Sequence, residues 1–477
     1  MRAFLVLATI AALVPACRKK APPLTVGLAL DVGGRGDQSF NDGTLRGLEN
    51  MAAGLRYTPR GYEPLPDPDY RLLLPPDLRS RPFPHLGIPQ PIVLQGKAQE
   101  DYEPNLRLLA AQGADLVVAV GFMMEPATRK VARDNPQTKF LLLDTPILDE
   151  AGKPSTLPNV RAVVFRENEG TFLAGAVAGE ITRSGKIGFV GGMQLPLIQK
   201  FEAGFRAGVA VVNPEAARNV LVAYTGTFDD ERKGVEVGLD LYRRGCDVVF
   251  HAAGLDGLGV IKAAQLSGKI VIGVDSDQSH VAPANVVTSM VKHADVVVYE
   301  TVRDVVQEKF TGGDVVLGLA EGALGLVPLS VSAFPTLRAM GLHDPEDLMA
   351  IVIDVQTLQH AVMTRHIPVP ATLEELKAFR GRIPARSGRP DSRCRPTTRA
   401  PPSVPASEPS TSTSCSCRRS ASGRTWCSGG SPAGSEASMP SARGGRYGRP
   451  PTARGCASRS TRLSRRSGSR RSSGSRS

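Results

Sequence analysis

The sequence of 477 residues predicts an α/β protein built from two doubly wound parallel-sheet lobes. Two observations predict this class. Continuous Val, Ile and Leu runs, typical of parallel strands buried on both faces, alternate with segments whose apolar residues recur at helical spacing. This alternation also occurs as two successive series, one on each side of residue 160. Each series is long enough to form a sheet covered by helices on both faces.

The first series begins with a strand, a glycine turn and a helix. "LTVGLAL" has the composition of a buried strand, and "DVGGRGDQSFND" at 31–42 follows it. Ser39 and Asp42 are spaced like a capping box, so we expect a helix to begin at Ser39. The Pro-rich segment 56–91 shows neither period and is typical of a surface insertion. The runs "PIVLQGK", "ADLVVAVG", "KFLLLD" and "VRAVVF" complete the first series.

The second series starts with the helix around "GTFLAGAVAGEITRSG". Its strand runs are "KIGFVGG", "NVLVAYTG", "CDVVFHAAG", "KIVIGVDSD" and "NVVTSMVK", with helical segments between them. Later helices around "ADVVVYETVRDVVQEKF" and "PEDLMAIVIDVQTLQHAVM" complete a folded region that we expect to end at residue 383. We predict a first lobe of 24–160 plus 290–315, and a second lobe of 161–289 plus 316–370.

The N-terminus has the layout of a secretory signal. "MRAFLVLATIAALVPACRKK" places a positive residue before a short apolar run, which is too short to span a bilayer. "VPAC" resembles the lipobox at which bacterial lipoproteins are cleaved and lipidated. We therefore expect residues 1–16 to be a signal peptide and Cys17 to carry a lipid anchor. The alternative is an ordinary secretion signal that contains a Cys.

The C-terminal segment 384–477 is rich in Ser, Arg and Pro and has no apolar period, which predicts disorder. It holds 19 Arg and 3 acidic residues, a charge of +16, so the preceding residues carry about −4 of the net +12. We therefore expect no nucleic acid partner for the folded part. The tail is interpreted as a basic arm, a solvated appendage or, most consistently with its lack of Lys, out-of-frame translation of a GC-rich gene.

Cysteine and motif content excludes several function classes. Of seven Cys, only Cys246 lies in the folded body, so no disulfide partner exists there. The glycines of the turn at 31–42 do not match GxGxxG, and its acidic residues would repel a pyrophosphate. The sequence has no phosphate-binding GxxxxGK[ST], no calcium loop, and no GxSxG or HExxH. We expect no cofactor, no metal and no enzymatic activity.

The turn at 31–42 does combine carboxylates with an aromatic residue. Phe40 either packs into the core, as most Phe side chains do, or faces a cleft and stacks on a flat ligand. In the second case Asp31 and Asp37 would accept hydrogen bonds from hydroxyl or NH groups of that ligand. The residues of the turn alone leave both interpretations open.

Five ordered blocks carry a resemblance to a known family. "LALDVGGRGDQSFNDGTLRGL", "NEGTFLAGAVAGEITRSGKIGFVGGMQLPLIQKFEAGFRAGV", "DVVFHAAGLDGLGVIKAA", "VIGVDSDQ" and "VVTSMVKHAD" resemble the basic membrane lipoprotein family. These proteins are similar to the purine nucleoside receptor lipoproteins and bind substrates for ABC importers. The resemblance covers Leu24 to Leu329. It implies a type I periplasmic-binding-protein fold, with two lobes joined by three crossovers that close on a ligand.

The resemblance also implies particular site residues. A purine base would lie between Phe40 and Phe228, and Asp275 would hold the ribose. Glu125 lies where the family usually has the shorter Asp, which bears on base preference. By motif position, the implied ligand-binding residues are Asp31, Asp37, Phe40, Asn41, Glu125, Phe228, Gly254, Asp275 and Lys292.

These features predict a monomeric lipoprotein of the cell envelope, anchored by lipid to a membrane on its periplasmic or extracellular side, which captures a nucleoside, most consistently a purine nucleoside, for an ABC permease and its ATPase subunit. One alternative is a binder of a non-nucleoside solute, such as a sugar or a vitamin. Another is an extracellular interaction protein whose cleft has lost its ligand and whose insertion 56–91 binds a partner. Stacking and ribose hydrogen bonds provide no leaving-group activation, so an enzyme acting on nucleosides is disfavoured.

Overall fold

The computed structural model describes residues 24–53, 55–58, 61–64, 90–342 and 345–380, all of which belong to one structural unit within residues 1–393. The predicted signal peptide, Cys17, residues 65–89 of the insertion and the tail 384–477 lie outside the described residues. None of the described helices combines the length and the apolar character needed to cross a membrane.

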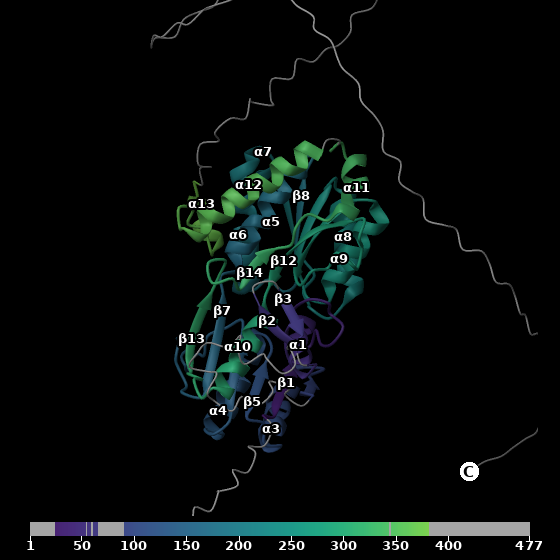
Figure 1. The fold of residues 1–477 in the computed structure, drawn as a ribbon. Coiled ribbons are helices and arrows are strands. Elements are labelled where there is room, and N and C mark those ends of the chain that lie inside the picture. The colour runs from purple at the N-terminus through teal and green to yellow at the C-terminus, as the bar shows by residue number, and fades with distance from the viewer. Residues whose placement is uncertain (1–23, 54, 59–60, 65–89, 343–344, 381–477) are drawn as a thin grey trace, which may run out of the picture. The chain divides into compact units, whose positions relative to one another are not determined.

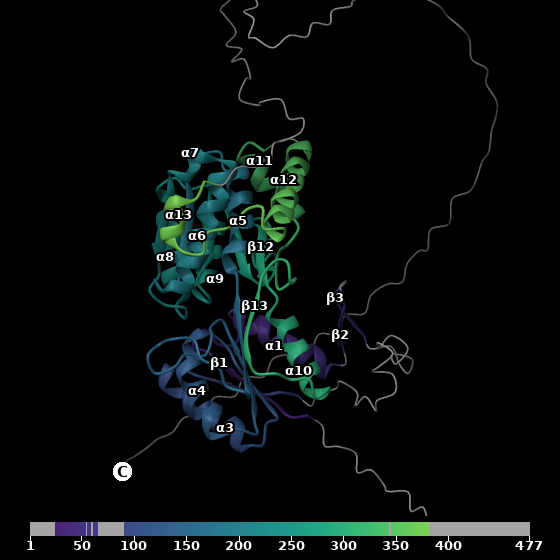
Figure 2. The ribbon, with the colours of Figure 1, turned by 90° about the vertical axis from the view of Figure 1, so that its left-hand side faces the viewer.

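The first lobe contains a six-stranded parallel sheet in the order β13-β7-β6-β5-β1-β4 (Figure 1). Its strands are β1 (Val26–Leu30), β4 (Ile92–Gln95), β5 (Leu116–Ala119), β6 (Lys139–Leu143), β7 (Val160–Phe165) and β13 (Gly313–Leu317). Its helices are α1 (Phe40–Ala52), α3 (Tyr102–Ala111), α4 (Glu125–Asp134) and α10 (Ala294–Val306). Alternate strand side chains pack on opposite faces, so α1 and α10 cover one face and α3 and α4 the other (Figure 2).

The second lobe repeats this plan in a sheet of order β14-β12-β11-β10-β8-β9, in which only β14 is antiparallel. Its strands are β8 (Ile187–Gly191), β9 (Val220–Tyr224), β10 (Val248–Ala252), β11 (Ile270–Asp275), β12 (Val286–Lys292) and β14 (Leu324–Leu326). Its covering helices are α5 (Glu167–Ile181) and α6 (Pro196–Val212) on one face, and α8 (Glu231–Arg243) and α9 (Asp256–Ser267) on the other.

Shorter elements complete the described chain. They are β2 (Leu55–Thr58), β3 (Gly61–Pro64), η2 (Gln99–Asp101), η3 (Phe122–Met124), α7 (Pro214–Ala217), η4 (Val331–Ala333), α11 (Phe334–Ala339), α12 (Pro345–Met363) and α13 (Leu373–Ala378). α12 packs on α5, and α13 packs on α6. β2 and β3 pair antiparallel inside the segment expected to be an irregular insertion. The Pro content of segment 56–91 led the sequence analysis to miss this short strand pair, in which Thr58 lies opposite Gly61.

Three crossovers join the lobes, and the fold class expected from the sequence is confirmed. The chain passes from β7 to α5, returns from β12 to α10, and crosses again from β13 to β14. The strand at 160–165 pairs with β6 and β13, so the first crossing follows Phe165, whereas the sequence placed it near 160. The crossovers are hydrogen bonded to each other, since the Arg166 amide donates to the Leu317 carbonyl at 2.8 Å and that of His293 to the Ala323 carbonyl at 2.9 Å.

The two sheets have equivalent strand orders, position by position. β6 therefore corresponds to β11, β5 to β10, and β7 to β12. Parallel α/β sheets bind ligands at the carboxyl ends of their strands. Both lobes consequently present the loops that follow their central strands as candidates for a shared site.

Candidate ligand-binding site

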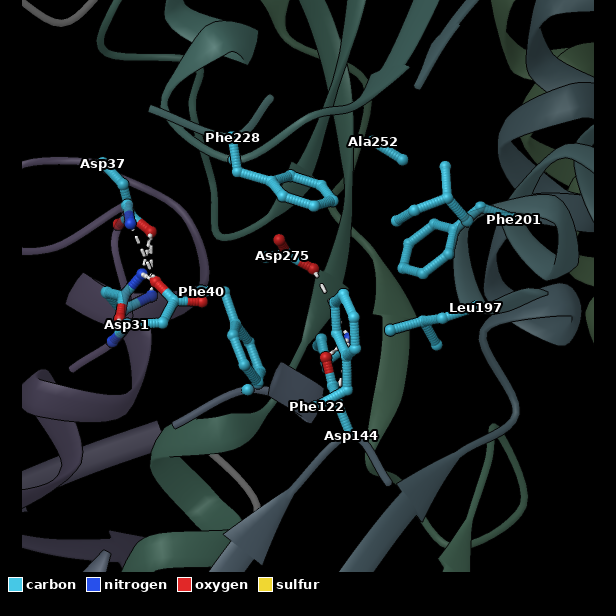
Figure 3. Close-up of a pocket in the computed structure, with 16 residues that line it drawn as sticks. Asp31, Asp37, Phe40, Phe122, Asp144, Leu197, Phe201, Phe228, Ala252 and Asp275 are labelled. Atoms are coloured by element: carbon cyan, nitrogen blue, oxygen red, sulfur yellow. Dashed lines mark hydrogen bonds and ion pairs between the residues drawn. The ribbon is translucent and has the colours of Figure 1, made fainter. Parts of the chain in front are cut away.

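A cavity lies between the lobes and is lined by residues from both (Figure 3). Eight of the nine residues expected from the sequence line it: Asp31, Asp37, Phe40, Asn41, Phe228, Gly254, Asp275 and Lys292. The lining is completed by residues that sequence reasoning missed: Gly33, Gly121, Phe122, Asp144, Leu197, Ile198, Phe201 and Ala252. The cavity is therefore apolar over much of its wall, with a few convergent polar groups, which is the usual composition of a small-molecule site.

Asp37 builds the start of α1. Its Oδ1 accepts from the amides of Ser39 at 2.9 Å and Asp42 at 3.1 Å, and its Oδ2 accepts from the amide and side chain of Asn41 at 2.9 and 3.0 Å. These bonds satisfy helix N-terminal amides that have no partner within the helix. Burial raises the pKa of Asp37 to about 6, against the lowering effect of these bonds. Asp37 thus lines the cavity mainly as a structural group.

Asp31 has more capacity for a ligand. Its Oδ1 accepts from the Asn41 side chain at 2.8 Å and from the Gly33 amide at 3.0 Å. Both bonds engage one oxygen, so Oδ2 retains its capacity to accept from a bound molecule. Burial raises the pKa of Asp31.

The predicted capping box at Ser39 is wrong. Ser39 is the N-cap residue, but its side chain caps no amide of α1; its Oγ donates to Oδ2 of Asp275 in the second lobe at 2.7 Å. Asp37 takes over the capping because its carboxylate lies directly beneath the helix start. Ser276 Oγ also donates to the Ser39 carbonyl at 2.9 Å, so hydrogen bonds join the lobes beside the cavity.

Four aromatic residues line the cavity: Phe40 and Phe122 from the first lobe, and Phe201 and Phe228 from the second. Phe40 packs against the core and also lines the cavity, being 9% exposed. Its stacking on a ligand stays a prediction. Phe122, at the start of η3, meets Phe228 edge to face, with ring centroids 6.3 Å apart and an interplanar angle of 75°. This pair approaches across the cleft (Figure 3).

The Phe228 loop is held by the start of α9. Asp256 accepts from Thr227 Oγ1 at 2.8 Å and from the Asp230 amide at 2.6 Å, on both sides of Phe228. The Leu255 amide donates to the Phe228 carbonyl at 3.0 Å. Gly254 has a φ of +54° and a Cβ there would lie 3.2 Å from the same carbonyl, so glycine suits this close approach. Phe228 is consequently fixed before any ligand binds.

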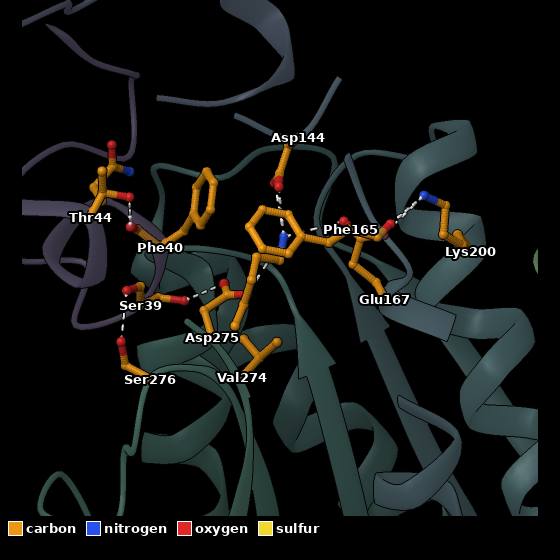
Figure 4. Close-up of polar contacts among 12 residues, drawn as sticks. Ser39, Phe40, Thr44, Asp144, Phe165, Glu167, Lys200, Val274, Asp275 and Ser276 are labelled. Atoms are coloured by element: carbon orange, nitrogen blue, oxygen red, sulfur yellow. Dashed lines mark hydrogen bonds and ion pairs between the residues drawn. The ribbon is translucent and has the colours of Figure 1, made fainter. Parts of the chain in front are cut away.

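Lys292 is the cationic centre of the site and is only 3% exposed. Its Nζ donates to both carboxylate oxygens of Asp144, at 3.0 and 2.9 Å. It lies 3.4 Å from Glu167 Oε1 and 4.0 Å from Asp275 Oδ1 (Figure 4). It also lies 4.6 Å from the centroid of the Phe40 ring, at cation–π distance.

The pKa values in this cluster show which forces act on it. Burial alone lowers the pKa of Lys292, but the neighbouring carboxylates outweigh it and hold that pKa above its ordinary value. Burial raises the pKa of Asp144 to about 7, with Lys292 opposing the shift. Burial also raises the pKa of Asp275. The neighbouring carboxylates therefore favour the charged form of the Lys292 ammonium, whereas burial disfavours the charged forms of Asp144 and Asp275.

Glu167 connects this cluster to the first crossover. Its second oxygen, Oε2, pairs with Lys200 on α6 at 2.9 Å, and Lys200 also donates to the Phe165 carbonyl at 3.1 Å. The ion pairs therefore continue from the cavity into the junction between β7 and α5 (Figure 4).

Glu125 does not line the cavity. It begins α4, is 4% exposed, and its Oε1 accepts from Arg129 at 3.1 Å and from the Leu148 amide at 3.0 Å. Its carboxylate thus holds the segment after β6 in place. In the described residues, no group of three or more His, Cys, Asp and Glu side chains is arranged to hold a metal ion.

Two of the missed residues had a signal in the sequence. Asp144 ends the run "KFLLLD" and Phe122 follows "ADLVVAVG", so both lie at carboxyl ends of predicted strands, where ligands bind. Leu197, Ile198 and Phe201 had none, because apolar residues at helical spacing look the same whether they face a core or a cavity.

Two α/β lobes that enclose a cavity of this composition define a solute-binding protein. The family model described as "ABC transporter substrate-binding protein PnrA-like" matches residues 25–338, and the chain belongs to this family. The resemblance identified from the sequence blocks is confirmed. The family consists of transport binding proteins, so its members capture a solute and do not transform it.

Relatives and solved structures support this family assignment. The chain is 32% identical to Basic membrane protein B of Borreliella burgdorferi over 283 residues, 58% of this chain and 76% of that protein. It is 31% identical to the CD4+ T-cell-stimulating antigen of Listeria monocytogenes over 327 residues, 65% of this chain and 81% of that protein. A solute-binding protein of an ABC transporter system from Aeropyrum pernix is 26% identical with a TM-score of 0.58, covering 75% of this chain and 96% of that one.

A solute-binding protein from Conexibacter woesei shares the fold, with 23% identity, a TM-score of 0.52, and coverage of 73% of this chain and 99% of that one.

Removing the Asp37 carboxylate tests its structural role. We expect Asp37→Ala to lower the free energy of unfolding by about 1–3 kcal/mol, because buried helix-start amides lose their acceptor. Urea unfolding followed by circular dichroism measures the change. Glu49→Ala, on the exposed face of the same helix, is the control and should change stability by less than about 1 kcal/mol. Equal effects of the two substitutions would contradict the assignment.

His251 predicts a pH dependence of stability. It is fully buried in β10, and burial lowers its pKa to about 4 from the ordinary 6.5. The unfolded chain therefore binds this proton first, and stability is lost as pH falls from about 6.5 to about 4, by up to about 3 kcal/mol. Thermal unfolding should show a shallower loss over this range for His251→Gln than for the unmodified protein. The control is the exposed His360→Gln, and a slope unchanged by His251→Gln would refute the prediction.

Proposed function

We propose that this protein captures a nucleoside, with a purine base preferred, and delivers it to an ABC permease and its ATPase subunit. The main support for this proposal is that one cavity contains aromatic rings from both lobes, hydrogen-bonding carboxylates and one ammonium. Flat apolar faces suit a base, and carboxylates suit the hydroxyls of a sugar. The resemblance to purine nucleoside receptor lipoproteins supports the same ligand class.

Phe40 and Phe228 are the proposed base-stacking residues, with Phe122 beside them. Phe228 is fixed by the Asp256 contacts, and Phe40 by its packing in the core and by Thr44 Oγ1, which donates to its carbonyl at 2.8 Å. Stacking of a base on such a ring contributes about 1–3 kcal/mol. Preorganised rings lose little conformational entropy on binding, so most of that energy is available as affinity.

Asp275 is the proposed sugar-binding carboxylate. Its Oδ1 is buried and has no hydrogen-bond partner among the described residues, although its Oδ2 is held by Ser39. An unsatisfied buried acceptor is costly, and a ligand hydroxyl supplies the missing donor. Four carboxylates line the cavity against one ammonium, which disfavours a phosphorylated ligand and favours a neutral one.

Replacing Phe228 tests the stacking role. Phe228→Ala should weaken nucleoside binding about 5- to 150-fold, because one ring face of the base loses its partner. Isothermal titration with adenosine, guanosine, inosine, cytidine and uridine measures this, with Glu125→Gln as a control that should retain affinity because Glu125 lies outside the cavity lining. No heat from any nucleoside with the unmodified protein would contradict the proposal. That result would favour the two alternatives, a binder of a non-nucleoside solute or an interaction protein whose cleft has lost its ligand.

We also propose that the protein is anchored to the envelope by a lipid on Cys17, which lies outside the described residues. Two relatives from Borreliella burgdorferi are named Basic membrane protein A and Basic membrane protein B, which supports a membrane location. Two or more acyl chains give stable attachment without a transmembrane helix.

The anchor predicts a change of fractionation. Cys17→Ser should move the protein, expressed in a bacterium, from the membrane pellet to the soluble fraction and abolish its labelling with radioactive palmitate. Cys246→Ser is the matched control, because Cys246 is a buried free thiol in the folded body. Palmitate labelling that persists in Cys17→Ser would refute the anchor.

A further inference from the structure

Asp144 and Asp275 occupy equivalent positions in the two lobes. Asp144 follows β6 and Asp275 ends β11, and these strands hold the same place in the two sheets. Both residues have a left-handed backbone, with φ of +75° for Asp144 and +62° for Asp275. Non-glycine residues adopt this conformation at an energetic cost and do so preferentially at functional sites. Both carboxylates are thereby turned toward the same ammonium.

Lys292 has three carboxylates around it but donates hydrogen bonds to only one of them, Asp144. Its Nζ donates to both oxygens of Asp144 at 2.9 and 3.0 Å, whereas Glu167 Oε1 is 3.4 Å and Asp275 Oδ1 is 4.0 Å away. All of these groups are buried, so solvent does not screen the choice between the carboxylates. The hydrogen bonds to Asp144, together with the Glu167 carboxylate, therefore hold the ammonium nearer to these two groups than to Asp275.

The position of the ammonium determines whether Asp275 Oδ1 has a hydrogen-bond donor within the protein. Oδ1 of Asp275 is buried without a hydrogen-bond partner among the described residues. Lysine side chains are flexible, and a shift of about 1 Å would bring Nζ into hydrogen-bond distance of this oxygen. A hydrogen bond from Nζ to this oxygen would compete with the ligand hydroxyl that is proposed to bind there.

We infer that Asp144 is a positioning residue that holds the Lys292 ammonium away from Asp275 and so keeps Asp275 Oδ1 free for a ligand hydroxyl. This inference rests on the proposed nucleoside function. It assigns Asp144 an effect on sugar recognition that operates through Lys292.

The first test is Asp144→Asn, which keeps the shape of the side chain and removes its charge. Lys292 should move to Asp275, and affinity for adenosine or guanosine should fall about 10- to 100-fold, the loss of one hydrogen bond to a charged group. Affinity for the 2′,3′-dideoxy analogue, which lacks the hydroxyl donors, should stay within about 2-fold of its unmodified value. Equal losses for both ligands would overturn the inference, because a purely structural defect weakens both.

The second test separates action through Lys292 from direct contact. In a Lys292→Gln background, Asp144→Asn should cost nothing further in riboside affinity, since no ammonium remains to be positioned. Independent, additive losses from the two substitutions would contradict the inference. Circular dichroism establishes that each variant is folded before titration.

A crystal structure of Asp144→Asn decides the inference even if Lys292→Gln does not fold or no nucleoside binds. The inference requires Lys292 Nζ within hydrogen-bond distance of Asp275 Oδ1 in that variant, and an unchanged separation near 4.0 Å would overturn it. Absence of nucleoside binding to the unmodified protein would instead refute the proposed function. The two failures are therefore distinguishable.

Discussion

The buried ammonium of Lys292 is the interaction on which the site and the lobe arrangement both depend. An ammonium removed from water requires several opposite charges around it, and here they come from separate parts of the fold. Asp144 belongs to the first lobe, Asp275 to the second, and Glu167 to the first crossover. Satisfying one charge thus brings the ends of both sheets to the same point. The cavity forms where these ends meet.

Capture follows from the same arrangement. The aromatic rings are supported by the surrounding fold, so the side chains proposed to stack on a flat ligand are already in place. Hydrogen bonds from Ser39 and Ser276 connect the lobes beside the cavity, so the turn at 31–42 lies at the lobe contact as well as in the wall of the site. Hinge closure around a ligand is the general mechanism of periplasmic binding proteins.

Much of the candidate site could be predicted because its residues lie in short motifs at strand ends. Asp31, Phe40, Asp275 and Lys292 were located by motif position, and all four line the cavity. Glu125 shows the limit of that reasoning. It is the first residue of α4, and its carboxylate accepts hydrogen bonds from Arg129 and the Leu148 amide instead of facing the cavity. Motif position specifies a place along the chain but not the direction of a side chain.

The sequence by itself determined the class of fold, the lobe repeat and the family, because strand composition, helical period and ordered motifs are local properties of the chain. The tertiary structure alone decided which carboxylates share Lys292, that Asp37 caps α1 while Ser39 reaches Asp275, and that Phe122 meets Phe228. Ser39 and Asp275, for example, are 236 residues apart in the chain. Contacts of this kind depend on the relative position of the two lobes, which local sequence patterns do not specify.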